Sequence, residues 1–426
     1  MEKTKDIYKF SRVMYIIEAA LEYFIAKIIA GAYIAKVTNE IGISDNITGI
    51  LTSFVSLGCG FQVIAIFLSN KRPFKPWVTV LHTLNQLFFA LIYVVPLLNF
   101  SKTEKTILFI IFLLLGHIIN NVVNSPKINW YMSLVDNNKR GKFTANKEII
   151  SLLSGMFFSF GMGSMMDKFE AEGNIKGAFI FCGLGIFGLT VLHTLTLLFS
   201  KEKPVEKTES KSAWKMLRDV ICNKNLVKII LISIIWNIAH YISTPFYGTY
   251  TTKDLGFSMT FISIVSAAYA VCRSLFSRPL GKYADKHSFA NMLNICFAVS
   301  HLAFLVFSFA VPENGKVMYL LYELLMSIAM AGINSATINL IFDYVDKDKR
   351  VGALALKSTL AGFAGFFTTL AISPLFNYIQ ENGNKFLGLN MYPQQVLSAI
   401  SASIVLLLIL YLNLVVRKIK RADTEE

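Results

Sequence analysis

The stretch DNNKRGKFTANK at residues 136–147 recurs 210 residues later as DKDKRVGALALK at residues 346–357. Both copies open on an aspartate, carry a Lys-Arg pair followed by a glycine, and end on a lysine. The 210-residue offset also pairs Asn124 with Asn334, Asn129 with Asn339, Gly155 with Gly365 and Gly173 with Gly383, and near the start of each half an offset of 214 pairs Tyr33, Thr38, Gly42 and Ser44 with Tyr247, Thr252, Gly256 and Ser258. Agreement in several regions at nearly one offset indicates an internal duplication.

Long apolar runs surround both copies. The chain of 426 residues is 54% hydrophobic and only 16% charged, whereas a soluble domain carries about 25% charged residues. Runs of roughly 20 apolar residues match the length that a helix needs to cross about 30 Å of hydrocarbon. We predict twelve spans, at Val13–Ala35, Ile47–Leu68, Trp77–Leu98, Thr106–Trp130, Phe143–Met166, Gly177–Phe199, Ile229–Tyr247, Phe257–Phe276, Phe289–Val311, Val317–Phe342, Ala353–Phe376 and Val396–Val416.

The duplication divides these spans into two sets of six. The predicted fold is therefore an all-α membrane protein of two pseudo-symmetric six-helix bundles, at residues 1–200 and 227–426. A polar stretch rich in lysine and glutamate, residues 201–226, reads as a linker, within which Trp214–Val220 has the pattern of a short amphipathic helix. Parallel repeats of this kind place a binding site near the bilayer midplane between the halves.

The formal net charge of +14 follows the predicted topology. Of the 41 lysines and arginines, 28 lie on the side that holds both termini and the linker, and 8 lie in the opposite loops. Such a bias places the lysine-rich side in the cytoplasm. We therefore expect a multi-pass protein of the cell (plasma) membrane with both termini cytoplasmic, embedded in the lipid bilayer and without a nucleic-acid partner.

Signatures of catalysis or of a cofactor are missing from the sequence. It contains no Walker A loop and no HExxH motif, and the six histidines are scattered along the chain. The five cysteines form no CxxC pair, and four of them fall inside predicted spans, which is typical of small buried residues. We expect no enzymatic activity, no metal site and no cofactor.

Polar residues follow one face of the first and seventh spans. Charges in hydrocarbon are costly and mark functional positions. Glu22 lies about 15 Å into the first span, counted from Arg12 at 1.5 Å per residue. Glu18 lies one turn nearer the interface, and Tyr33 projects close to the direction of Glu22 if the helix is continuous. In the seventh span Trp236, His240, Thr244 and Tyr247 share a face.

The fourth and tenth spans carry similar stripes. The fourth contains His117, Asn120, Asn121 and Asn124, and the tenth contains Glu323, Ser327 and Asn334. We expect Glu22 and Glu323 to bind a proton or a cationic group of the substrate. His117 and His240 would relay protons or donate hydrogen bonds, and Trp236 with the tyrosines would stack on an organic solute. The alternative is that the amides, serines and histidines only join neighbouring helices.

A motif between the eighth and ninth spans gives the chain a resemblance to the major facilitator superfamily. That family carries Gly-x-x-x-Asp-Arg/Lys-x-Gly-Arg/Lys-Arg/Lys between spans two and three, with a weaker copy between spans eight and nine. The second copy here is GKYADKHS at residues 281–288, which keeps Gly281, Asp285 and Lys286 and has Ser288 in place of the second glycine. The first copy, KRPFK at residues 71–75, keeps only basic character.

The resemblance implies a fold and a gate. It implies that spans one, four, seven and ten line a central cavity, and the polar stripes described above fall on those four spans. It also implies that Asp285 latches the two halves on the cytoplasmic side, against the helix end near Phe143. Gly281, Lys286, Arg140 and Arg350 are the other residues expected at this gate. Gly155, Gly161 and Gly163 lack the proline of the exporter signature, which argues against a drug–proton antiporter.

We expect secondary active transport of a small organic solute by alternating access, coupled to protons or sodium, in a monomer. This expectation corresponds to a symporter, and an uncoupled facilitator (uniporter) and a transport-dead membrane sensor are the alternatives within this architecture. A polytopic membrane enzyme would need clustered histidines and carboxylates near one interface. The mixture of carboxylates, amides and aromatics suits sugars, nucleosides, amino-acid derivatives and cationic organics equally well.

Overall fold

The computed structural model describes residues 6–68, 73–136, 139–204, 218, 221–342 and 350–419. These residues are almost entirely helical, as the apolar runs predicted. The first half contains α1 (Lys9–Ile28), α2 (Gly31–Ile41), α3 (Asp45–Thr52), α4 (Phe54–Gly60), α5 (Ile64–Leu68), α6 (Lys75–Val94), η1 (Val95–Leu97), α7 (Lys102–Ser133), α8 (Arg140–Ala171) and α9 (Ile175–Phe199).

The second half repeats this order. It contains α11 (Lys224–Ser243), η3 (Thr244–Phe246), α12 (Tyr247–Thr249), η4 (Tyr250–Asp254), α13 (Met259–Lys286), α14 (Phe289–Phe307), α15 (Gly315–Phe342), α16 (Arg350–Glu381), α17 (Pro393–Leu414) and η5 (Val416–Lys418), with a short hairpin of β1 (Lys385–Phe386) and β2 (Leu389–Asn390) before α17. Apart from Arg218, the segment predicted as a short helix at Trp214–Val220 lies outside the described residues.

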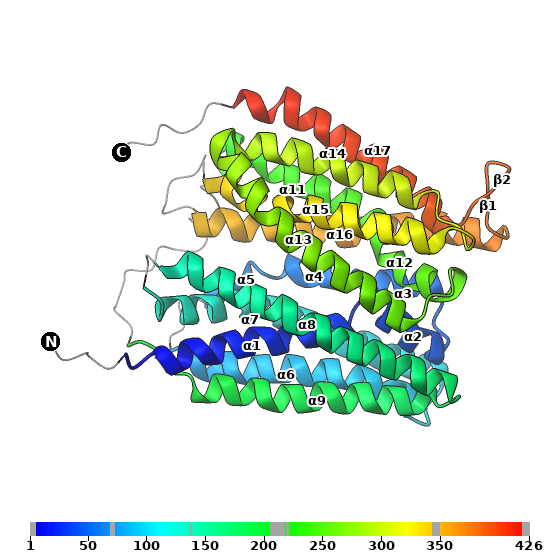
Figure 1. The fold of residues 1–426 in the computed structure, drawn as a ribbon, viewed down its shortest axis with the longest axis horizontal. Coiled ribbons are helices and arrows are strands. Elements are labelled where there is room, and N and C mark those ends of the chain that lie inside the picture. The colour runs from blue at the N-terminus through cyan, green and yellow to red at the C-terminus, as the bar shows by residue number, and fades with distance from the viewer. Residues whose placement is uncertain are drawn as a thin grey trace.

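Twelve transmembrane segments result, in two layers (Figure 1). Ten helices of the described residues are long and apolar enough to cross a membrane. The other two segments are the first, which carries several charges, and the second, which is divided among α3, α4 and α5. The first half forms the lower layer of Figure 1 and the second half the upper layer, with the start of α1 and the end of α17 at the same end of the molecule. We call this the terminal end, and the end that carries the hairpin the opposite end.

The first and seventh segments are broken helices. In the first, α1 ends at Ile28 and α2 starts at Gly31, whose φ of +51° is readily adopted only by glycine. The seventh bends at the same relative place, where Pro245 opens the 3₁₀ turn η3. The prediction of one uninterrupted helix from Val13 to Ala35 was therefore wrong, because the apolar pattern continues through the break. The angular relation inferred between Glu22 and Tyr33 is wrong for the same reason.

Several helices extend past their predicted spans. Residues 281–286, expected in a loop, form the last turns of α13, and α8 starts at Arg140 instead of Phe143. Hydropathy detects only the part of a helix that lies in hydrocarbon, and polar turns continue beyond the membrane where water and headgroups solvate them. The gate motif is consequently helical.

Local geometry confirms the duplication. Gly42 and Gly256 both have positive φ, at +82° and +63°, and Gly173 and Gly383 both have φ of +68°. Ser44 and Ser258, at the same offset of 214, both cap the following helix by accepting a backbone N–H bond. Matching turns at matching positions show that the two halves are built on one plan.

Close helix crossings join the two halves. α4 packs on α16, where a Cβ on Gly362 would lie 2.5 Å from the backbone nitrogen of Gly60. α8 packs on α13, where a Cβ on Gly163 would lie 2.7 Å from the backbone oxygen of Met259. Only glycine allows backbones to approach this closely, as is common between membrane helices.

Polar contacts seal the opposite end. Both carboxylate oxygens of Asp167, near the end of α8, accept hydrogen bonds from the first backbone N–H groups of α13, at 2.7 Å from Met259 and 2.7 Å from Thr260. A carboxylate at a helix N-terminus also interacts favourably with the helix dipole. On the symmetric side Lys253 contacts Asp45 at 2.5 Å, and Ser373 donates to Asn46 at 2.5 Å. The structure is therefore closed at the opposite end.

Replacing Asp167 with alanine should open this closure. Two charge-assisted hydrogen bonds between the halves would be lost, each worth about 1.5–3 kcal/mol. We expect the distance between spin labels at Glu172 and Glu313, at the opposite end of different halves, to shift to longer values. Asp136→Ala is the control, because the exposed Asp136 pairs with Lys139 within the first half. An unchanged distance distribution in Asp167→Ala would show that this contact does not hold the halves together.

Candidate functional site

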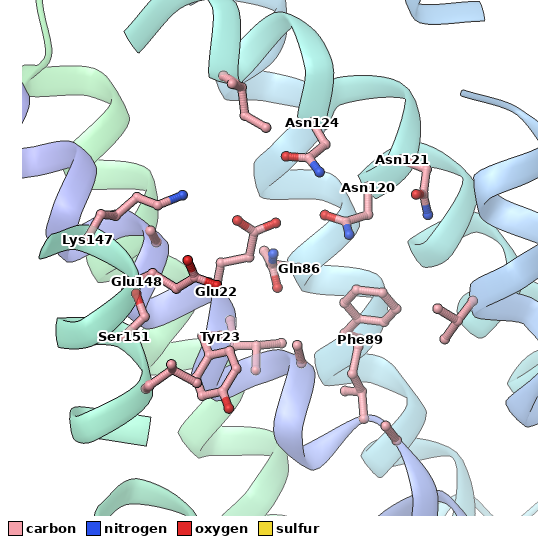
Figure 2. A pocket seen from close by; sticks show the side chains of 18 of the residues that line it. Glu22, Tyr23, Gln86, Phe89, Asn120, Asn121, Asn124, Lys147, Glu148 and Ser151 are labelled. Atoms are coloured by element: carbon pink, nitrogen blue, oxygen red, sulfur yellow. The ribbon is translucent and has the colours of Figure 1, made fainter. Parts of the chain in front are cut away.

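Two adjoining cavities lie along α1. The first has a volume of about 710 Å³ and lies mostly in the first half. Figure 2 shows Glu22 and Tyr23 entering it from α1, three asparagines from α7, and Lys147, Glu148 and Ser151 from α8. The residues predicted from the sequence that line it are Glu22, His117, Asn120, Asn121 and Asn124.

The second cavity lies between the halves and has a volume of about 530 Å³. Tyr23 and Ala26 of α1 and Ala30, which lies between α1 and α2, line both cavities, so the two adjoin. The residues predicted from the sequence that line the second cavity are Tyr33, His240, Tyr247 and Glu323. Together the cavities bring side chains from segments one, four, seven and ten into one region.

Three predicted residues lie away from both cavities. Trp236 is 6% exposed and packs against Phe297 at a centroid distance of 5.5 Å. Ser327 is fully buried and donates to the Leu324 carbonyl of its own helix at 2.6 Å. Asn334 is exposed and is not among the lining residues of either cavity in the described part of the chain. In this conformation these side chains contribute to packing or to the surface.

A buried charge cluster forms the wall behind Glu22. Lys127 of α7 has a side chain only 2% exposed, and its ammonium group lies 2.7 Å from Glu18 Oε1 and 2.5 Å from Glu22 Oε2. The third neighbour of the ammonium is His82 Nε2, at 2.8 Å. The three N–H groups of the ammonium thus each have an acceptor, which is the arrangement that makes a buried charge tolerable.

The two histidines of the cluster have defined roles. Since the ammonium donates to Nε2 of His82, that ring is neutral with its proton on Nδ1, which donates to Asn85 Oδ1 at 2.8 Å. Asn85 in turn donates to the Gly116 carbonyl at 3.2 Å. Nε2 of His193 lies 2.9 Å from Glu18 Oε1 and donates to it. Glu18 Oε2 is buried and has no partner among the described residues.

The carboxylates of this cluster outnumber its ammonium group. Glu18 and Glu22 face a single ammonium, so two neutral histidines leave one net negative charge in the membrane interior. Glu18 is fully buried, whereas Glu22 is 23% exposed and reaches the first cavity. Glu18, His82 and His193 also place ligand atoms within 4.8 Å of one another, but the Lys127 ammonium occupies the space next to them. The donor set therefore fits a proton better than a metal ion.

Sequence analysis identified Glu22 but not its partners. Lys127, His82 and His193 come from three other helices, and no spacing within one helix relates them to Glu22. The available signal was the position of Lys127 inside an apolar span, since an intramembrane lysine requires a partner. Glu18, placed near the interface from the sequence, is fully buried, as are His82 and His193.

Charges on the terminal side of the first cavity bridge the halves. Lys147 of α8 lies over the Tyr15 ring at 5.1 Å. Glu148, the next residue, lies 4.0 Å from Arg273 of α13, which gives Arg273 the carboxylate partner that the sequence did not reveal.

The latch predicted for Asp285 is not formed among the described residues. Asp285 is exposed near the end of α13, and the described residues show no hydrogen bond or ion pair to it. Arg140 donates to the carbonyls of Met132 and Val135 in its own half. Gly281 and Lys286 belong to the same terminal turns of α13, and the side chain of Arg350 lies outside the described part. The latch remains a prediction for another conformation.

Comparison with known families covers nearly the whole chain. The sequence model described as Major Facilitator Superfamily matches residues 17–366 and 229–425. Among curated proteins, the comparison found no match.

Solved structures share the fold at low sequence identity. The nucleoside transporter NupG is 15% identical, with a TM-score of 0.71 over 96% of this chain and 100% of that one. The xylose transporter XylE from E. coli is 12% identical, with a TM-score of 0.69 over 98% and 99% of the chains. A POT family peptide transporter is 11% identical, with a TM-score of 0.71 over 98% of both chains.

Removing the central cation of the cluster should destabilise the protein. Lys127→Met leaves Glu18 and Glu22 facing each other without compensation, and breaking a buried ion pair costs about 3–5 kcal/mol. We expect a clear fall in the thermal unfolding midpoint in detergent, with partial recovery in Lys127→Met/Glu18→Gln. Lys147→Met removes a cavity-facing lysine that has no such role and serves as the control. Equal midpoints for the two single variants would contradict the cluster described here.

Proposed function

Because the chain belongs to the Major Facilitator Superfamily, we propose that it moves a small organic solute across the membrane by proton-coupled secondary active transport. The family and the fold make it a membrane transporter and not an enzyme. Substrate and coupling ion are our inference from the site.

The observation that carries the coupling proposal is the uncompensated charge around Lys127. Two carboxylates, one ammonium and two histidines are buried together, and one carboxylate reaches the cavity. A negative charge in the membrane interior is costly, and binding one proton neutralises the cluster. The cluster is therefore suited to bind a single proton, which reaches it through Glu22.

Protonation would change what α1 contacts. A protonated Glu22 no longer attracts the Lys127 ammonium, so α1 and α7 lose one of the ion pairs that hold them in register. α1 also lines both cavities and packs against α8, which crosses to the second half through α13. A change at Glu22 therefore has a direct mechanical path to the contact between the halves.

Alternating access follows from the arrangement of contacts. The halves are sealed at the opposite end by Asp167, Asp45 and Asn46, while at the terminal end the described residues show no ion pair or hydrogen bond to Asp285. With the lysine-rich terminal end in the cytoplasm, this conformation faces inward. In the outward-facing state the seal breaks and Asp285 closes on the first half. We place the protein in the cell membrane as a monomer.

Glu22→Gln should uncouple transport from the proton gradient. Glutamine keeps the shape and hydrogen-bonding capacity of the side chain but cannot take up a proton at neutral pH. The substrate is first identified by a thermal-shift screen of the purified protein against metabolites, since a ligand stabilises the state that it binds. In proteoliposomes we expect accumulation driven by a pH gradient to be lost, while exchange of labelled for unlabelled substrate continues.

The control is Glu40→Gln, which alters an exposed carboxylate at the opposite end. Gradient-driven accumulation that survives in Glu22→Gln would show that Glu22 does not carry the coupling proton. If the wild-type flux itself ignores a pH jump and a sodium gradient, the protein is an uncoupled facilitator. If no solute moves at all, the transport-dead sensor is the better description.

A further inference from the structure

The second cavity presents two opposite charges that do not neutralise each other directly. Glu323 projects from α15 of the second half and Lys27 from α1 of the first half, and both line the cavity. Both side chains are partly exposed, and within the described residues neither has an ion-pair partner within 4 Å. Lys27 and Glu323 therefore line the same cavity without forming an ion pair across it.

Aromatic rings surround the carboxylate. Tyr319 lies one turn before Glu323 on α15 and lines the same cavity, and Tyr247 packs on Tyr322 at a centroid distance of 5.3 Å. Tyr269 lines the same wall. Tyrosine faces attract organic cations and provide apolar area for a ring or a branched side chain. The end of the cavity at Glu323 is thus suited to an ammonium group attached to an apolar body.

Additional polar groups in the cavity lack partners. His240 Nδ1 and Ser159 Oγ are buried without a hydrogen-bond partner among the described residues, and both residues line this cavity. Buried polar groups are normally satisfied by protein or by an occupant. These residues add polar groups to the wall that carries Lys27 and Glu323.

The charged residues of the second cavity indicate which charges its ligand carries. Around Lys127 the opposite charges touch each other, so that cluster needs no outside partner except a proton. In the second cavity one positive and one negative group stay apart, each at the energetic cost of an unpaired charge in the membrane interior. A ligand with only one charge would leave the other protein group unpaired, whereas a ligand with both charges satisfies the two together.

From this geometry we propose that the second cavity binds an organic zwitterion of the amino-acid or short-peptide class. Its ammonium group lies at Glu323 among the tyrosines, its carboxylate at Lys27, and its apolar body between them. That the zwitterion is transported rests on the proposed function, whereas its binding to the second cavity does not. Because the two charged residues belong to different halves, such a ligand ties the halves together when it binds.

Matched probes test the proposal by thermal stabilisation of the purified full-length protein. The zwitterions are L-phenylalanine, L-leucine, L-alanyl-L-phenylalanine and L-phenylalanyl-L-alanine. Each is compared with its amide, which keeps only the positive charge, and with its N-acetyl derivative, which keeps only the negative charge. We expect at least one zwitterion to raise the unfolding midpoint in a saturable manner, with an affinity at least about tenfold above both derivatives.

Two variants assign the charges. In Lys27→Met the zwitterion should lose its advantage over its amide, and in Glu323→Gln it should lose its advantage over its N-acetyl derivative. Lys147→Met and Glu148→Gln, which alter the same residue types in the first cavity, should leave both preferences unchanged. For each variant, the shift caused by the zwitterion is compared with the shifts caused by its two derivatives on that same variant. A change in the variant's stability without ligand therefore does not affect the result.

The proposal is overturned if no zwitterion stabilises the wild-type protein, or if the preferences persist in Lys27→Met and Glu323→Gln. Zwitterion binding with no pH-driven uptake in proteoliposomes would contradict the coupling mechanism and leave this inference standing. Proton-driven uptake of another solute, with no zwitterion binding, would contradict this inference and leave the proposed function standing.

Discussion

A charge inside a membrane must have an opposite charge, a hydrogen-bonding shell or water beside it, and this constraint organises the molecule. The first segment alone carries Glu18, Glu22 and Lys27. Glu18 and Glu22 meet the constraint through Lys127, whose side chain is only 2% exposed. Lys27 meets it by facing a cavity. The positions of α1, of both cavities and of the neighbouring helices all follow from where these three side chains can be accommodated.

The same segment shows why the chain breaks where it does. Between Ile28 and Gly31 the helix stops, and α2 turns to meet α12 of the other half, where a Cβ on Gly248 would lie 2.6 Å from the Gly31 carbonyl. The break lets α1 present its charges to the cavities while α2 closes the opposite end. A straight helix would serve only one of these purposes. Glycine at both positions allows the backbones to touch.

The sequence predicted the fold well and the site only in part. Apolar runs and the repeated offsets were enough for twelve segments in two halves, because both signals are local. Glu22, the asparagines of α7, His240 and Glu323 were found because each lies on a polar stripe of one helix. Lys127, His82 and His193 were missed because their relation to Glu22 exists only across helices. The helix break at Gly31 was missed because its flanks remain apolar, and Trp236 was misread because an aromatic ring on a polar stripe can face the core.

The duplication makes the distribution of charge informative. At the repeat offsets, Glu18, Glu22 and Lys127 of the first half correspond to Ile232, Trp236 and Thr337 of the second, all of them buried. Conversely, Glu323 corresponds to Leu113, which is 1% exposed. Two halves that share turns, caps and breaks have thus placed their charges at different positions. Both halves must pack their helices in the same way, so their turns and caps stay alike. A single proton needs only one acceptor, however, and a charge on the substrate needs only one partner, so the charged residues need not be repeated. The asymmetry is what a transporter requires if the first half holds the proton and the two charged groups of the substrate are shared between Lys27 of the first half and Glu323 of the second.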